Sequence, residues 1–214
     1  MRRWMLILAA AIWSVPCVAQ TQAADRSWIA VSNSYANMLI EVVFKHHPEA
    51  GTQQGLSQYD TKVAQPTLAD ENQERKETEA VLAKLKSAAA EKQQQDVAED
   101  LQIMIRRVNL NFKREDFRRA NEVPFLNASQ IVFGGLQVLL DEQTSSERRP
   151  AAVVRIREYA GLEPGYTALT EILKQRITEQ MAKPGVIYPA KVEIETEMAR
   201  NSNYIVGIAA LMQK

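Results

Sequence analysis

Residues Gln93–Arg119 form a long polar stretch that carries a single apolar stripe and contains no glycine or proline. At about 1.5 Å per residue, an α-helix of this length would extend for roughly 40 Å. Such a helix cannot bury its stripe alone, so the sequence predicts several helices packed against one another. The stripe consists of residues that recur at steps of three and four: Val97, Leu101, Met104, Ile105, Val108 and Phe112.

The rest of the chain also shows helical spacing, and strand-like alternation is absent. We therefore predict an all-α fold, a bundle of about six or seven helices. The last helix, opened by Pro189, is expected to run through Val192, Ala199, Val206 and Ala209. The other expected helices are Trp28–Lys45, a short one from Pro48, Thr67–Ala90, Ala128–Leu140, Ser146–Ala160, and one from Pro164 to about Lys183.

The N-terminus has the pattern of a secretory signal. Arg2 and Arg3 precede an apolar segment, Trp4–Val15, which is too short to span a bilayer. Small residues before position 20 suit cleavage, so we expect a signal peptide at 1–19, a short linker at 20–27 and a helical domain at 28–214. The protein is then periplasmic or secreted, with no stable membrane anchor. Cys17, the only cysteine, lies inside the signal, so the mature chain forms no disulfide.

Charge narrows the possible partners. Lys plus Arg total 26 and Asp plus Glu total 26, so a dedicated nucleic-acid binder, which needs excess positive charge, is excluded. A basic run, Arg106–Arg119, nevertheless occupies the polar side of the long helix. We expect a solvated face whose charges pair at i,i+4 with interleaved acids. The alternative is a site for an anion or acidic partner, with Arg107, Arg114 and Arg118 roughly in line.

Candidate catalytic and metal-binding residues are few. His46 and His47 are adjacent and so point about 100° apart on a helix, which makes them poor joint metal ligands; we expect an exposed helix end. Ser57 and Asp60 suggest a triad only by proximity to these histidines. Glu193, Glu195 and Glu197 fan out on a helix and do not converge as acid–base partners. We therefore assign no catalytic, cofactor-binding or metal-binding residue to this chain.

The segment His47–Asp60 resembles the N-terminal signature of the bacterial family catalogued as domain of unknown function 885. That signature has a proline, a small-residue/threonine pair, a glycine three residues on, and a Tyr/His-Asp pair, matched here by Pro48, Gly51-Thr52, Gly55 and Tyr59-Asp60. The long helix, the apolar segment to Leu140 and the Glu147-Arg148-Arg149 helix opening follow in the same order. The resemblance spans about residues 28–214.

The resemblance implies an exported, mostly helical protein similar to zinc metallopeptidases whose H-E-x-x-H helix lies in a C-terminal half. This chain lacks that motif, so we expect it to be the N-terminal portion of a longer protein, inactive alone, with zinc present only if the C-terminal region is supplied. That region, or another protein, would pack on the last helix. The alternative is a stand-alone periplasmic helical binding or scaffold module.

Overall fold

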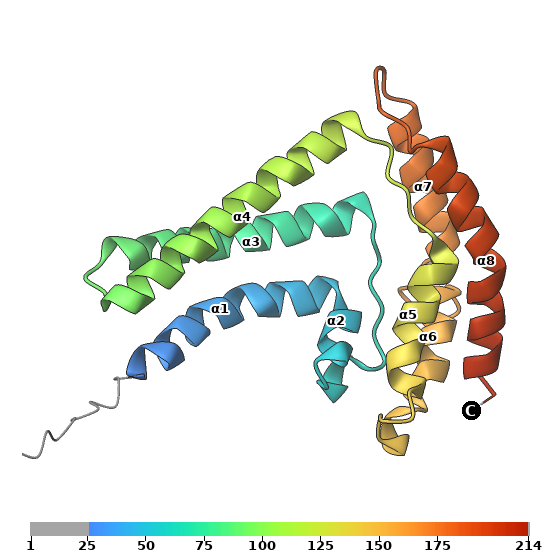
Figure 1. Ribbon diagram of the computed structural model, residues 1–214, viewed down its shortest axis with the longest axis horizontal. Coiled ribbons are helices and arrows are strands. Elements are labelled where there is room, and N and C mark those ends of the chain that lie inside the picture. The colour runs from blue at the N-terminus through green and yellow to red at the C-terminus, as the bar shows by residue number, and fades with distance from the viewer. Residues whose placement is uncertain (1–25, 214) are drawn as a thin grey trace, which may run out of the picture.

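The computed structural model describes residues 26–213, and the predicted signal peptide lies outside that range. The described part is all-α, which confirms the predicted fold class (Figure 1). None of its helices is long and apolar enough to cross a membrane. Its helices are α1 (Ser27–His46), α2 (Pro48–Gln53), α3 (Leu68–Ala90), α4 (Gln95–Asn121), α5 (Ala128–Leu140), α6 (Ala151–Tyr159), α7 (Leu169–Met181) and α8 (Lys191–Leu211), with 3-10 turns η1 (Ser57–Tyr59) and η2 (Ser146–Arg148).

The helices form two groups, which we call the arm and the block (Figure 1). The arm consists of α1, α3 and α4, which pack on one another around the predicted stripe of α4. Val97 and Leu101 of that stripe meet Val42 of α1 and Leu85 of α3 in the core of the arm. The long helix thus has the partners that its length and stripe require.

The block consists of α5, α6, α7 and α8, with α5 in contact with the other three. Leu136, Leu139 and Leu140 of α5 are buried against Ala152 of α6. A second cluster joins Tyr159 of α6 to Leu169 and Leu173 of α7. The apolar composition of α5, which is hydrophobic on more than one side, follows from this central position.

Two predicted helices begin later than expected. The segment 146–160 divides into η2 and α6, and Pro150 lies at the N-cap of α6, where its missing N–H costs no hydrogen bond. The next helix begins at Leu169 and not at Pro164, because Gly161 takes a positive φ of 69° and turns the chain beside Ala168.

The sequence predicted the last helix, and the structure shows which side of α8 packs on the block. Val192, Ala199, Val206 and Ala209 are exposed. The side that faces the block carries Tyr204, whose ring lies 5.9 Å from that of Phe133 on α5, and Ile208, which packs on the leucine cluster of α5. The helix has apolar residues on two opposite sides, and periodicity alone does not say which side packs.

The Gly134-Gly135 pair in α5 provides a matched test of this packing. A Cβ at Gly135 would lie 2.1 Å from Oη of Tyr159, whereas a Cβ at Gly134 would meet nothing within 4 Å. We expect Gly135→Ala to lower the free energy of unfolding by about 1–3 kcal/mol through overpacking. Gly134→Ala should leave it unchanged or raise it by up to about 1 kcal/mol. Urea unfolding of the two variants measures both; equal effects would contradict the close approach of α6 to α5.

Candidate functional site

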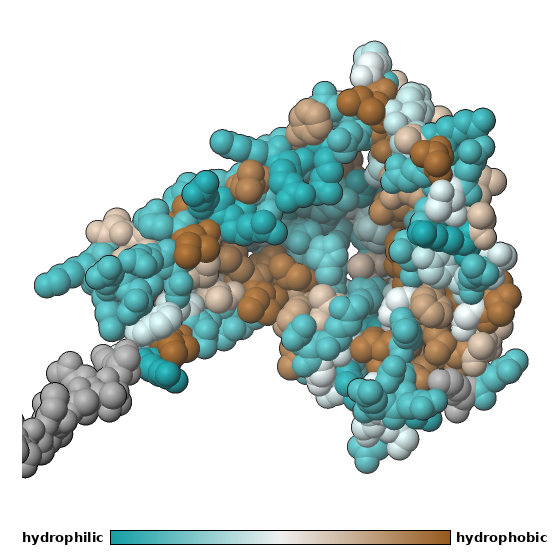
Figure 2. Space-filling view, viewed as in Figure 1, coloured by the Kyte–Doolittle hydropathy of each residue, from teal (hydrophilic) through white to brown (hydrophobic). Residues whose placement is uncertain are grey.

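A hollow of about 1150 Å³ lies between the arm and the block (Figure 2). Its walls come from α3 and α4 on the arm side and from α7 and the start of α8 on the block side. The extended segment after α4 closes one end, where Val123 donates from its backbone N–H to the carbonyl of Ile187 at 2.9 Å. A concave surface of this size is the default candidate for a binding site.

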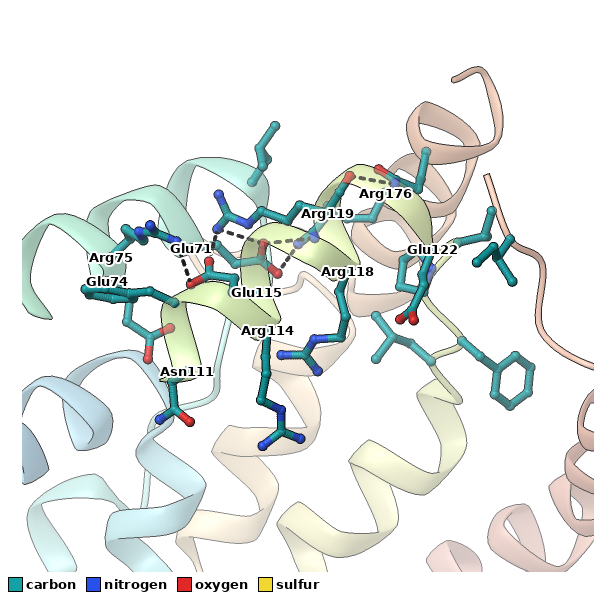
Figure 3. Close-up of a pocket in the computed structure, with 18 of the residues that line it drawn as sticks. Glu71, Glu74, Arg75, Asn111, Arg114, Glu115, Arg118, Arg119, Glu122 and Arg176 are labelled. Carbon is teal, nitrogen blue, oxygen red and sulfur yellow. Dashed lines mark hydrogen bonds and ion pairs between the residues drawn. The ribbon is translucent and has the colours of Figure 1, made fainter. Parts of the chain in front are cut away.

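One face of α4 lines this hollow with Arg107, Asn111, Arg114 and Arg118. The steps of four, three and four place the four side chains on one side of the helix. Figure 3 shows that Asn111, Arg114 and Arg118 point away from the ion pairs on the α3 side of α4. Within residues 26–213, none of the three arginine side chains has a hydrogen-bond or ion-pair partner. We call Arg107, Arg114 and Arg118 the arginine row.

On the α3 side of α4, charged side chains connect the arm to the block. Glu71 of α3 accepts two hydrogen bonds from Arg176 of α7, at 2.6 and 3.0 Å, and forms an ion pair with Arg119 of α4 at 3.2 Å. Gln180 of α7 also donates to the backbone carbonyl of Arg119 at 2.8 Å. We call Glu71, Arg119 and Arg176 the α7 joint. It holds three helices at one edge of the hollow.

A second connection lies at the same, block-facing end of the arm, where the segment 47–60 after α1 meets the block (Figure 1). Asp60 accepts hydrogen bonds from Nε and Nη2 of Arg148, both at 2.7 Å, which is the bidentate geometry that suits a guanidinium. Asp60 is only 4% exposed. This pairing leaves no support for the triad of Ser57 and Asp60 that the sequence suggested by proximity.

Arg155 of α6 lies beside this pair and is 0% exposed. Its guanidinium donates to the carbonyl of Gly135 at 2.6 Å, of Tyr59 at 3.0 Å and of Lys62 at 3.1 Å, and to the hydroxyl of Thr52. Burial lowers the pKa of Arg155, because it disfavours the charged guanidinium. The four hydrogen bonds compensate for this cost, since each uses an N–H of the charged form. We call Thr52, Asp60, Arg148 and Arg155 the α2 joint.

The histidines occupy different environments. His46 is 4% exposed, so the expectation of an exposed helix end was wrong for it. Its Nδ1 lies 2.8 Å from Asp70 and its Nε2 lies 3.1 Å from Glu77, both on α3. His47 is exposed, lines the hollow and pairs with Glu74 at 3.1 Å.

These residues do not fit a zinc ion. The two carboxylates at His46 approach opposite ring nitrogens, so the three groups do not converge on one point. No group of three or more His, Cys, Asp or Glu among residues 26–213 could hold a metal ion. Of the three glutamates weighed as acid–base partners, Glu195 pairs with Lys191, Glu197 pairs with Arg200, and Glu193 lines the hollow.

The contact between α1 and α3 predicts a stability change in acid. A hydrogen bond from Lys45, followed by one from Gln73, lowers the pKa of Glu77 from 4.5 to about 2. A lowered carboxyl pKa stabilises the fold above the unfolded value, and that contribution is lost as the pH falls from about 4.5 to about 2. We expect Glu77→Gln to flatten the pH dependence of urea unfolding in this window. Glu91→Gln, an exposed control at the end of α3, should reproduce the wild-type slope.

Comparisons with known proteins give one match. A family model described as a bacterial protein of unknown function (DUF885) covers residues 48–214. No curated protein matches the chain at a significant level, and no solved structure does. The match includes the segment from Pro48 to Asp60, whose polar residues form part of the α2 joint. Two residues of this segment therefore bind side chains of the block: Thr52 accepts a hydrogen bond from Arg155, and Asp60 accepts hydrogen bonds from Arg148.

Proposed function

Since the chain belongs to the bacterial protein family of unknown function DUF885, we propose that it is an exported, helical binding module that receives a ligand in the hollow. In this proposal the module serves a metallopeptidase-like protein and presents a peptide to a catalytic region outside the chain. Zinc and the general base would belong to that region. The bonds that already occupy His46 and His47 support this division of roles.

The arginine row is the observation that carries the proposal. Arginines on a protein surface are commonly matched with nearby acids, as Arg119 is with Glu115 at 2.6 Å. The three arginines of the row instead face the hollow without a partner among the described residues, between two joints that hold its walls together. A concave surface lined by unpaired guanidinium donors is suited to binding a polar ligand.

A peptide mixture tests this function even though the ligand is unidentified. We would dialyse the protein against a protease digest of casein and identify retained peptides by mass spectrometry. Asn111→Trp should reduce retention by about tenfold, because an indole at the centre of the α4 face obstructs the surface between the three arginines. Lys113→Trp, which is exposed on the same helix outside the hollow, is the control. Equal retention by both variants would refute the hollow as the site.

The outer side of α8 favours a second candidate, a scaffold module that packs on another polypeptide. Val192 is 69% exposed, Met198 is 70% exposed and Val206 is 68% exposed. A run of exposed apolar side chains on one helix is typical of an interaction surface. A defined, stoichiometric complex with a co-exported protein that survives Asn111→Trp and is lost in Val206→Glu would favour this candidate over ligand binding in the hollow.

A further inference from the structure

Building on the proposed function, we propose that the ligand of the hollow is an extended acidic peptide whose carboxylates bind the arginine row. Guanidinium groups bind carboxylates in a bidentate, charge-assisted geometry, as Arg148 does with Asp60 within this chain. The arginine row offers three such groups along one wall of the hollow.

The spacing of the row matches an extended chain. At about 1.5 Å per residue, Arg118 and Arg114 are offset by about 6 Å along α4, and Arg114 and Arg107 by about 10.5 Å. An extended peptide rises about 3.3 Å per residue, so these offsets correspond to about two and three peptide residues. Side chains of an extended peptide alternate between two faces, so acids at positions i and i+2 share one face and would lie opposite Arg118 and Arg114. A third acid on that face, at i+4, would reach toward Arg107.

The remaining charges of the hollow favour a peptide over a polyphosphate. Glu71, Glu74 and Glu115 on the wall already bind Arg176, His47 and Arg119. Glu122 at the end of α4 and Glu193 on α8 line the hollow, and neither side chain has a hydrogen-bond or ion-pair partner within the described part of the chain. These two carboxylates repel a ligand that is anionic throughout but can bind an α-amino group or backbone N–H donors.

The end of the hollow next to the block is apolar. Leu126, Ile187 and Tyr188 line it and are exposed, the last two by more than half. They follow Glu122 and precede Glu193 in the chain, so an apolar surface adjoins the two acidic side chains. An apolar residue near the amino end of the peptide would bury surface there. The preferred ligand is thus an extended peptide with a free amino terminus, an apolar residue near it and several acids beyond.

The test compares two fluorescent peptides by polarisation at physiological salt. Both have a free amino terminus and a leucine near it; one carries glutamate at i, i+2 and i+4, and the other carries glutamine there. We expect the glutamate peptide to bind about tenfold or more tightly, since each exposed charge pair contributes up to about 1 kcal/mol. Inorganic tripolyphosphate should compete poorly.

Two double variants with equal loss of charge complete the design. Arg114→Gln/Arg118→Gln removes two members of the row and should weaken the glutamate peptide by about tenfold. Arg106→Gln/Lys113→Gln removes two cations of α4 that do not line the hollow, and should change binding by less than about twofold. Circular dichroism and thermal melts verify that both variants are folded.

The outcomes separate the inference from the proposed function. If both peptides bind equally and Asn111→Trp abolishes both, the hollow binds peptides but the acidic preference is wrong. If tripolyphosphate displaces the peptide at lower concentration than the peptide itself, the ligand is a polyphosphate and the inference is wrong. Equal weakening by the two double variants would also overturn it. If neither peptide binds, the inference fails, and the casein digest with Asn111→Trp decides the proposed function separately.

Discussion

Replacing Arg155 with alanine is expected to lower the free energy of unfolding by about 3–5 kcal/mol, the largest effect that we predict for a single substitution. The guanidinium is fully buried and donates to three backbone carbonyls and to the hydroxyl of Thr52. Removing it takes away a donor from four acceptors, two of them in fully buried hydrogen bonds, and creates a cavity between α6, α5 and the segment after α2. Urea unfolding followed by circular dichroism measures the change.

Arg157→Ala is the matched control for Arg155→Ala. Arg157 lies on the same helix, two residues away, and its side chain is half exposed beside Glu163. An exposed ion pair contributes little, so this variant should stay within about 0.5 kcal/mol of the wild type. Arg155→Lys should recover only part of the loss, because an ammonium cannot reach acceptors spread around a planar guanidinium. Similar stabilities for Arg155→Ala and Arg157→Ala would show that the α2 joint does not hold the fold.

The second large effect is expected at Asp60, whose carboxylate binds Arg148 through two hydrogen bonds of 2.7 Å. Asp60→Asn should lower the free energy of unfolding by about 2–3 kcal/mol, because it leaves the guanidinium in a largely buried position without its charge partner. Glu147→Gln, an exposed acid beside Arg148, should have an effect below about 0.5 kcal/mol.

A double-mutant cycle with Arg148→Met isolates the pair itself. We expect the double variant Asp60→Asn/Arg148→Met to be less destabilised than the sum of the single variants by more than about 1 kcal/mol. Strict additivity would show that the Asp60 carboxylate does not stabilise the fold through Arg148.

The helices themselves could be predicted from the sequence, because their apolar periodicity is local information. The stripe of α4 and the apolar segment of α5 have the positions and the burial expected of them, with Val97, Leu101 and Leu136 in the core. The family match also agrees with the resemblance carried by residues 47–60. The predicted export signal and cellular location stay predictions, since they concern residues outside the described range.

The polar joints could not be predicted, because their members are distant in sequence. Asp60 and Arg148 are 88 residues apart, and Thr52 and Arg155 are 103 residues apart. The burial of His46 depends in the same way on α3, which brings Asp70 and Glu77 to its two ring nitrogens. Periodicity identifies the apolar side of a helix. It does not identify which polar residue of a distant element will bind a given polar side chain of that helix.

In the basic run Arg106–Arg119, the side of the helix on which an arginine lies determines whether it pairs with an acid or lines the hollow. The sequence left open whether these residues form a paired, solvated face or an anion site in line. The structure divides them: Arg119 pairs with Glu115 at i,i+4, whereas the row of Arg107, Arg114 and Arg118 faces the hollow. Both interpretations therefore describe part of the same helix, and the angular position of each arginine determines which one applies.

The central claim is that the α2 and α7 joints hold the arm and the block as one frame around the hollow, with the arginine row directed into it. A spin-label distance between Cys introduced at Lys113 on α4 and at Lys174 on α7, with Cys17 changed to serine, tests this most directly. We predict one narrow distance distribution that broadens markedly when Asp60→Asn and Glu71→Gln are combined. A broad distribution in the protein with both joints intact, or one that the two substitutions leave unchanged, would contradict the claim.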